Sequence, residues 1–308
     1  MSADQRISHN SKLLLLGSCF SDEIGKKLQE NGFLAEVNPG GTIFHPLALS
    51  KLLLWALSDQ YQPLRIFRRN DVYLSWDLSG TFFTMSEVDL HLKFEALYNQ
   101  MRTALQSSSH LFITFGSSWA FTLKADHQIV ANCHKASSSQ FNKELTALDV
   151  LLADWQALLL QLQTFNPKLQ VVFTVSPVRH LKDGLIANNR SKARLLLLTE
   201  DLSQFANCSY LEAYELVLDE LRDYAFYKED GAHPNQKATQ AVWELLQERI
   251  LSLEALKVLE EWEGLQKRSA HRILYPESAA AKKLVQTLAE EEASFFSRYP
   301  DFQRPNHF

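Results

Sequence analysis

The sequence predicts an α/β protein in which helices wrap a parallel sheet. Short uninterrupted apolar runs at 13–16, 111–115 and 171–175 suit strands that are buried on both faces of such a sheet. Longer segments with a helical pattern separate these runs. Strands that alternate with helices imply right-handed crossover connections, and hence a parallel sheet covered by helices.

The first of these segments, Lys12 to Gly25, reads KLLLLGSCFSDEIG and predicts a strand that turns sharply into a helix. The leucine run ends at Gly17, and the small residues Ser18 and Cys19 follow. Ser21 can cap a helix, and the two acids after it suit a first helical turn because the helix dipole favours negative charge there. The turn should therefore lie at the carboxyl edge of the sheet, where open α/β sheets bind their ligands.

The remaining elements follow from apolar periodicity and from Pro and Gly signals. In the first half we expect helices and short strands at 23–31, 33–37, 46–57, 72–76, 81–83 and 89–106. In the second half we expect a strand at 111–115, a hairpin of 121–124 with 128–131, a helix at 143–164, a strand at 171–175, a helix at 189–206, a short strand at 210–212 and a helix from 235.

The chain changes character at Ser252, where charge-rich helical segments begin. We therefore predict an α/β domain over 1–251 and a helical extension over 252–308. The extension would be either a two-helix appendage or a contact for self-association.

Composition excludes several classes of protein. The chain has 308 residues, 46% of them hydrophobic and 22% charged, which is ordinary for a globular protein. The formal net charge of −5 argues against nucleic acid as a partner, and no apolar run approaches the ~20 residues that span a bilayer. The polar amino terminus lacks a secretory apolar region, so we expect a cytoplasmic protein. The three cysteines have no metal-site spacing and should be reduced thiols.

A second informative stretch supplies a candidate base. Asp230 and His233 stand three residues apart in a loop before the last helix of the predicted domain. A carboxylate so placed can orient an imidazole and stabilise the imidazolium that forms when it takes a proton. The alternative is plain helix capping and turn chemistry. With Ser18 and Cys19 as neighbouring candidate nucleophiles, the set predicts nucleophilic catalysis.

Six stretches in one order carry a resemblance to a known family: GSCFSDEIG, NPGGTIFHP, ITFGSSWAF, VANCHK, FTVSPVRHLKDG and FYKEDGAHPN. Over roughly Lys12 to Gln247 the chain resembles the GSCFA branch of the SGNH/GDSL hydrolase superfamily, although GSCFS stands here for GSCFA. The resemblance implies a flavodoxin-like three-layer α/β/α sandwich. It also implies a serine nucleophile, a histidine base and a nearby aspartate.

Some catalytic residues of that family have clear counterparts in this sequence, and others do not. His233 and Asp230 match its final D-x-x-H block. In the first block Cys19 stands where the serine usually is, and Ser18 stands where the aspartate is. We favour Cys19 as nucleophile and keep Ser18 as the alternative. We expect the thiol pKa to be lowered by the imidazole and the helix amino terminus, whereas a structural role would make Cys19 a small buried residue.

The oxyanion hole implied by the resemblance is incomplete. The Cys19 backbone N–H and Gly41 match its expected donors. The third block reads Gly116-Ser117-Ser118-Trp119, so Ser118 takes the place of the usual asparagine. Asn132 is a hypothetical replacement donor. The alternative for both side chains is an ordinary turn or strand-end role.

Other candidates concern the substrate. Arg179 and His180 follow a predicted strand and could bind a polar or anionic group, unless the arginine is simply solvated. Cys133 and His134 are adjacent and cannot easily chelate one metal ion, so we expect no metal site and assign His134 to the substrate side. Trp119 would line the cleft or the core.

The sequence thus predicts a hydrolase of ester or acyl groups that needs no metal or other cofactor. The substrate would be a small molecule or carbohydrate ester, with no nucleic acid or membrane partner and with self-association through the C-terminal helices. The rival is a binding or scaffold protein that has kept the SGNH frame and lost turnover.

Overall fold

A computed structural model describes residues 5–60, 62–270 and 275–305. Its centre is a five-stranded sheet of order β2-β1-β5-β8-β9, in which every pairing is parallel. The strands are β1 (Lys12–Gly17), β2 (Leu34–Val37), β5 (His110–Phe115), β8 (Gln170–Val175) and β9 (Cys208–Tyr210). The three long apolar runs thus form adjacent central strands, as predicted.

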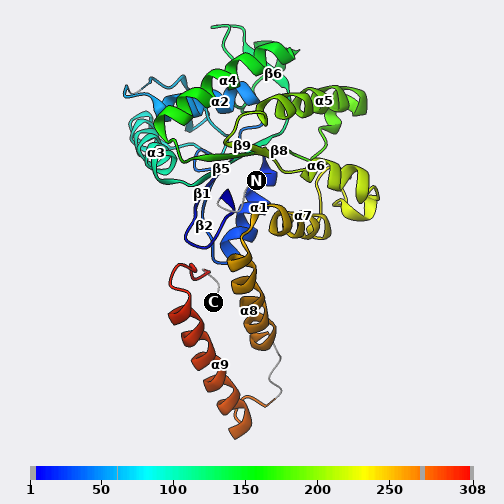
Figure 1. The fold of residues 1–308 in the computed structure, drawn as a ribbon. Coiled ribbons are helices and arrows are strands. Elements are labelled where there is room, and N and C mark those ends of the chain that lie inside the picture. The colour runs from blue at the N-terminus through cyan, green and yellow to red at the C-terminus, as the bar shows by residue number, and fades with distance from the viewer. Residues whose placement is uncertain (1–4, 61, 271–274, 306–308) are drawn as a thin grey trace.

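Helices cover both faces of this sheet (Figure 1). One face carries α2 (Pro46–Leu57), α3 (Glu87–Ser107), α4 (Leu148–Phe165) and α5 (Gly184–Leu202), and the other carries α1 (Cys19–Glu30) and α7 (Gln236–Ile250). Side chains of β1 alternate between the two layers: Leu14 and Leu16 join the first core, and Leu13 and Leu15 join the second. The predicted three-layer α/β/α fold is confirmed.

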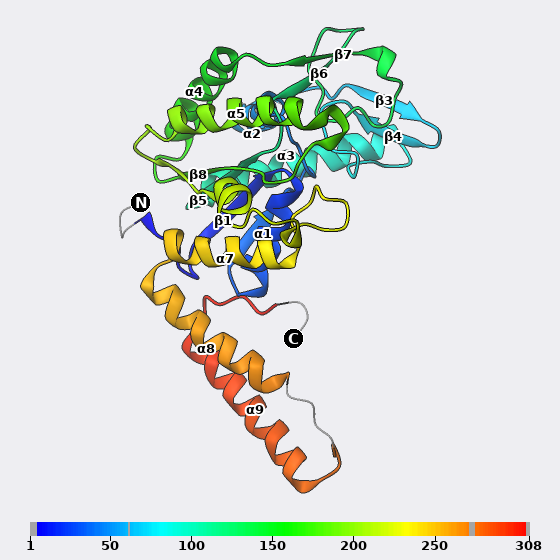
Figure 2. The same cartoon turned by 90° about the vertical axis from the view of Figure 1, so that its right-hand side faces the viewer.

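Two small antiparallel hairpins stand beside the main sheet (Figure 2). They are β3 (Ile66–Arg69) with β4 (Val72–Ser75), and β6 (Trp119–Leu123) with β7 (Phe141–Leu145). The predicted pairing of 121–124 with 128–131 forms in part. Ile129 bridges Thr122, the Leu123 N–H donates to the Gln128 carbonyl at 2.9 Å, and the Val130 N–H donates to the Phe121 carbonyl at 2.8 Å. In addition, β6 pairs along its whole length with β7, a pairing that the sequence did not predict.

Two further sequence-based elements need correction. The helix expected from residue 143 begins at Leu148, because residues 141–145 form β7. The strand expected at 81–83 does not form, and only Thr84 makes a bridge, to Tyr73. Short helical elements complete the domain: η2 (Ser138–Gln140), η3 (Leu181–Asp183), α6 (Ala213–Glu215), η4 (Leu216–Glu220) and η5 (Tyr224–Phe226).

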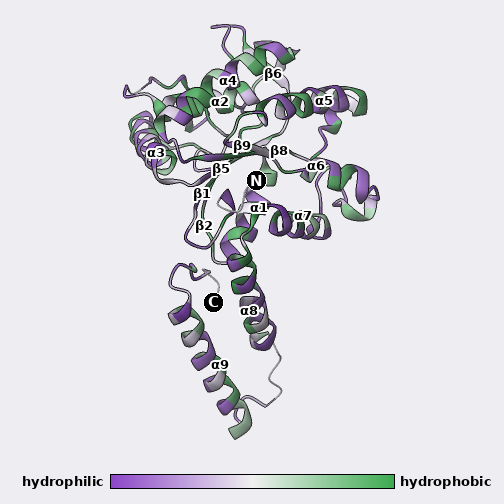
Figure 3. Cartoon of the chain, in the orientation of Figure 1, coloured by the Kyte–Doolittle hydropathy of each residue, from purple (hydrophilic) through white to green (hydrophobic). Residues whose placement is uncertain are grey.

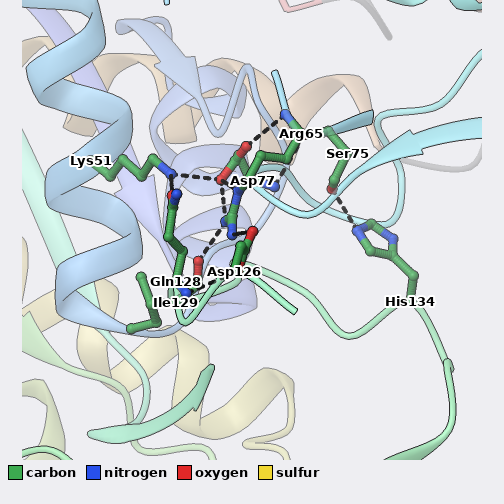
Figure 4. Close-up of polar contacts among 8 residues, drawn as sticks. All are labelled: Lys51, Arg65, Ser75, Asp77, Asp126, Gln128, Ile129 and His134. Carbon is green, nitrogen blue, oxygen red and sulfur yellow. Dashed lines mark hydrogen bonds and ion pairs between the residues drawn. The ribbon is translucent and has the colours of Figure 1, made fainter. Parts of the chain in front are cut away.

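A buried ion network joins the hairpins to α2 (Figure 4). Asp77, 4% exposed, accepts hydrogen bonds from the Lys51 Nζ and the Arg65 Nε, both at 2.9 Å. Arg65 also pairs with Asp126 at 2.9 Å and donates to the Ile129 carbonyl at 2.6 Å. The network therefore holds the segment around Ile129 against the first hairpin.

The C-terminal segment forms two helices, α8 (Leu253–Ser269) and α9 (Ala279–Arg298), which extend away from the sheet (Figures 1 and 2). Hydrophobic and hydrophilic residues intermix along both (Figure 3). Trp262 and Phe295 form a small core between them, and Trp262 Nε1 donates to the Glu30 carbonyl at 3.2 Å. Leu259 packs into the main domain's second core, so contacts cross the boundary predicted at 251. Self-association through these helices stays a prediction.

Within the described residues, none of the helices combines the length and the apolar character that a bilayer span requires.

Candidate active site

The turn between β1 and α1 is held against β5. Gly17 has a φ of +134°, and a Cβ there would lie 2.2 Å from the Thr114 carbonyl oxygen, so the close approach of the strands requires glycine. The next amide, of Ser18, donates to the same carbonyl at 3.1 Å. The Ser18 hydroxyl caps α1 by accepting from the Phe20 N–H at 3.2 Å. The helix thus begins at Cys19, two residues before the cap predicted at Ser21.

This arrangement separates the two candidate nucleophiles. Ser18 is 1% exposed and its hydroxyl is engaged in the cap. Cys19, at the first helical position, is half-buried and lines a cavity of about 410 Å³. A cavity of this size accepts a small ligand.

The Asp230–His233 pair reaches the same cavity. The Asp230 carboxylate receives three hydrogen bonds: from His233 Nδ1 at 2.6 Å, from the His233 N–H at 3.0 Å and from the Ala232 N–H at 2.9 Å. The backbone donors and then the ring hold the pKa of Asp230 well below its usual value. His233 lines the cavity with Cys19, and its Nε2 is the ring nitrogen left to act there. No hydrogen bond joins the two side chains within the part of the chain described.

The pKa of the Cys19 thiol is raised, which overturns the expected lowering. Burial is the largest cause, and the nearby carboxylates of Asp22 and Glu23 add to it. The Cys19 backbone N–H and Lys192 act in the opposite direction. A helix amino terminus lowers a thiol pKa only when its charge effect exceeds the cost of desolvation.

Two predicted oxyanion donors are occupied elsewhere. The Gly41 N–H donates to the Asn38 carbonyl at 2.7 Å, inside its own turn. Ser118 is fully buried, and its hydroxyl donates to the Ser191 carbonyl at 3.1 Å. Neither group faces the cavity, so both assignments are corrected: the turn and the packing of α5 use these donors.

The other two predicted donors do lie at the cavity. The Cys19 N–H belongs to the first turn of α1, where amides have no partner within the helix. Asn132 lines the cavity, and its Oδ1 accepts from the His134 N–H at 2.7 Å. That bond leaves the Asn132 Nδ2 as the donating group of the side chain.

Arg179 and His180 both line the cavity. The Arg179 guanidinium stacks over Tyr227, 4.2 Å from the ring centroid, and its backbone N–H donates to the Ala232 carbonyl at 3.0 Å. Arg179 is thereby tied to the loop that carries His233. Burial lowers the pKa of His180 to about 4, with Lys192 contributing in the same direction, so His180 is neutral at pH 7.

His134 does not reach the cavity, and its assignment to the substrate is wrong. It is 5% exposed, its Nε2 contacts the Ser75 carbonyl at 2.7 Å (Figure 4), and its ring packs edge-on against Trp76. The side chain instead joins the 129–134 segment to β4.

Several cavity residues escaped the sequence analysis. Phe44, Ser117, Phe121 and Asp183 line it, as does Trp119, which the sequence left between cleft and core. Lys143 forms an ion pair with Asp183 and lies 4.9 Å from the Trp119 ring centroid. The pairing of β6 with β7 brings Lys143 beside Trp119 and Phe121, and no local pattern signals that pairing. In the described residues no group of three His, Cys, Asp or Glu side chains could hold a metal ion.

The fold and the cavity define a class: a three-layer α/β protein with a thiol and an aspartate-oriented imidazole at the carboxyl edge of its parallel sheet. The sequence profile of the GSCFA family matches residues 12–246. The chain therefore belongs to the GSCFA family, and the resemblance drawn from the motifs is confirmed.

Three solved structures that are similar to this chain share little sequence with it. A GDSL-like lipase candidate from Parabacteroides merdae ATCC 43184 has 13% identity and a TM-score of 0.35, over 79% of this chain and 96% of that one. A carbohydrate esterase family 3 protein from Talaromyces cellulolyticus has 10% identity and a TM-score of 0.34, over 82% and 99%. The acetyl xylan esterase Est2A from Butyrivibrio proteoclasticus has 11% and 0.33, over 78% and 64%. No curated protein matches the chain.

Proposed function

We propose that this protein is an SGNH-type hydrolase of ester or acyl groups in which Cys19 is the nucleophile, His233 the general base and Asp230 the residue that orients it. The observation that carries the proposal is the meeting of Cys19 and His233 in one cavity, with His233 Nδ1 bound to Asp230. Membership of the GSCFA family supports the hydrolase class.

The reaction would proceed through a thioester. His233 Nε2 takes the thiol proton, and the Cys19 sulfur attacks the acyl carbon. The carbonyl oxygen becomes an oxyanion, for which the Cys19 N–H and the Asn132 Nδ2 are the proposed donors. As the tetrahedral intermediate collapses, the imidazolium protonates the departing alcohol. Water, deprotonated by the same imidazole, then attacks the thioester, and the acid leaves as the proton returns to the thiol.

The cavity walls suit a small acyl group on a ring-shaped alcohol. Aromatic side chains form part of the lining, through Phe44, Trp119 and Phe121, while Arg179 and His180 supply polar groups. Flat apolar rings beside a few polar groups are typical of small-ligand sites. We therefore propose an ester of a small molecule or carbohydrate as the substrate.

The test is hydrolysis of short-chain aryl esters and thioesters by the wild type and by single variants. Cys19→Ala and His233→Ala should each lower kcat/KM by roughly 10³-fold or more. Cys133→Ala is the matched control, because Cys133 lines the same cavity, and it should retain activity. Full activity in His233→Ala would disprove the mechanism. Activity lost in Ser18→Ala but kept in Cys19→Ala would transfer the role to Ser18.

One observation favours the alternative of a binding protein without turnover: the raised pKa of the Cys19 thiol, which disfavours the thiolate at neutral pH. An acyl or fluorophosphonate probe separates the two functions. Labelling at Cys19 that is lost in His233→Ala supports the enzyme, whereas a wild-type protein that neither labels nor hydrolyses any ester of the panel supports the binding protein.

A further inference from the structure

A buried lysine lies behind the cavity. Lys192, on α5, is 1% exposed, and its Nζ donates to the Gly116 carbonyl at 2.7 Å and to the Ser176 carbonyl at 2.6 Å. These carbonyls directly follow β5 and β8, at the edge of the sheet where β1 ends in the Cys19 turn. Among the described residues no carboxylate forms an ion pair with it. Fully buried lysines without an acidic partner are rare, because desolvation of an ammonium is costly.

The acidic group that interacts electrostatically with this ammonium is the Cys19 thiol. The Ser18 amide binds the Thr114 carbonyl, two residues before Gly116, so the Cys19 turn and the lysine share the same end of β5. Burial lowers the pKa of Lys192 to about 7, and interaction with Cys19 is the one effect that opposes it. Conversely, Lys192 lowers the pKa of Cys19 against burial.

We propose that Lys192 supplies the positive charge that stabilises the Cys19 thiolate from the protein side of the cavity. The thiol proton goes to His233, as in the proposed mechanism: the S–H bond breaks and an N–H bond forms on the imidazole. The Lys192 ammonium stays protonated throughout and stabilises the negative charge left on the Cys19 sulfur. That charge takes the place of the carboxylate that a buried lysine usually has as its partner.

This role differs from that of His233. The His233 imidazole lines the cavity with its side chain 45% exposed, and it would take the thiol proton, pass it to the leaving alcohol and then deprotonate water. Lys192 contacts neither cavity nor solvent and acts only through Cys19, so it is a positioning residue. Its importance for catalysis rests on the proposed function, but its effect on the thiol does not.

The test measures the rate of Cys19 alkylation by iodoacetamide between pH 6 and 10, followed by peptide mass spectrometry, and requires no ester turnover. Lys192→Gln keeps hydrogen-bond donors for the two carbonyls and removes the charge, whereas Lys192→Arg keeps the charge. We expect Lys192→Gln to slow Cys19 alkylation about tenfold at pH 7.5, equivalent to a rise of about one pKa unit, and Lys192→Arg to restore much of the rate.

Cys133 is the internal control, because it lines the same cavity and its rate should not change. A purely structural lysine would leave the Cys19 profile unchanged in a folded Lys192→Gln variant, and that result would overturn the proposal. If this variant does not fold, the reciprocal measurement decides. Cys19→Ala should lower the pKa of Lys192 in an NMR titration of labelled lysine, and an unchanged pKa there would overturn the proposal equally.

Discussion

The two walls of the cavity are built by different means. One wall, here the sheet-edge wall, comprises Cys19, Ser117, His180 and His233, which follow the ends of β1, β5 and β8 or precede α7. The other, the hairpin wall, comprises Trp119, Phe121, Val130, Asn132 and Cys133, on β6 and the segment after it. The strands of the main sheet hold the first wall directly. A buried ion network and a second hairpin hold the other.

The comparison shows that different parts of the structure hold the candidate catalytic residues and the aromatic lining of the cavity. The candidate nucleophile and base depend on the central sheet, whose strands are buried on both faces. The aromatic lining depends on Asp77 and its cations, which lie outside that sheet. Changes to the hairpin wall should therefore alter stability and substrate binding, and leave the protonation chemistry of Cys19 and His233 in place.

The largest effect is expected at the network itself. Asp77→Ala leaves the half-buried Arg65 and Lys51 without their shared carboxylate, and loss of one partner of a buried ion pair costs about 3–5 kcal/mol. Urea denaturation should show this loss. The control is Asp71→Ala on the same hairpin, where the exposed pair with Arg68 at 3.9 Å should contribute less than about 1 kcal/mol. An equal loss of unfolding free energy in Asp77→Ala and Asp71→Ala would show that the buried network does not stabilise the hairpin wall more than an exposed ion pair does.

Asn132 tests whether the hairpin wall also takes part in the chemistry. Asn132→Asp retains the oxygen that accepts from the His134 N–H and removes the proposed oxyanion donor. Removal of one such donor typically lowers kcat by ~10²–10³-fold, with a smaller change in KM. Ser118→Ala, at the other predicted donor, should lower stability without a comparable change in kcat. Unchanged turnover in Asn132→Asp would leave the hairpin wall with a binding role alone.

Acidification should lower the stability of the protein by protonating His45, which joins α2 to the segment after β7. His45 caps α2, contacts Thr146 just after β7 at 3.0 Å, and has its pKa lowered to about 4 by burial. The unfolded chain binds this proton at a pKa near 6.5, so the contribution of the neutral ring is complete above about pH 6.5. It is lost as the pH falls toward 4, by at most about 1.4 kcal/mol per pH unit.

Denaturant titrations at pH 7.5 and 5.0 measure this slope. His45→Asn keeps a side-chain cap for α2 and removes the titrating group, so it should flatten the dependence. An identical slope in wild type and variant would exclude His45 as its source.

The smallest effect is expected at Trp119. Its ring lines the cavity beneath Lys143, and its Nε1 donates to the Ala187 carbonyl at 3.2 Å. Trp119→Ala should raise KM for aryl esters by roughly two- to tenfold, the equivalent of about 0.5–1.5 kcal/mol of aromatic contact, with kcat changed less. Trp119→Phe keeps an aromatic face and should lie between. A kcat defect larger than the KM defect would place Trp119 in the chemistry.

The sequence by itself determined the parallel sheet, the positions of its long strands, and the turn and loop that carry Cys19 and His233. These features are local: buried strands need unbroken apolar runs, and a sharp strand-to-helix turn needs small residues. The spacing of Asp230 and His233 was sufficient to predict their pairing, because two side chains three positions apart in one loop can reach each other.

Only the tertiary structure decided which groups face the cavity. It turned the Gly41 amide and the Ser118 hydroxyl inward, buried His134 against β4, and raised the pKa of Cys19. It also paired β6 with β7 and placed the Lys192 ammonium on the carbonyls that follow β5 and β8. The physical reason is that hydrogen-bond partners and desolvation depend on the neighbours that pack around a group, and those neighbours come from segments distant in the chain.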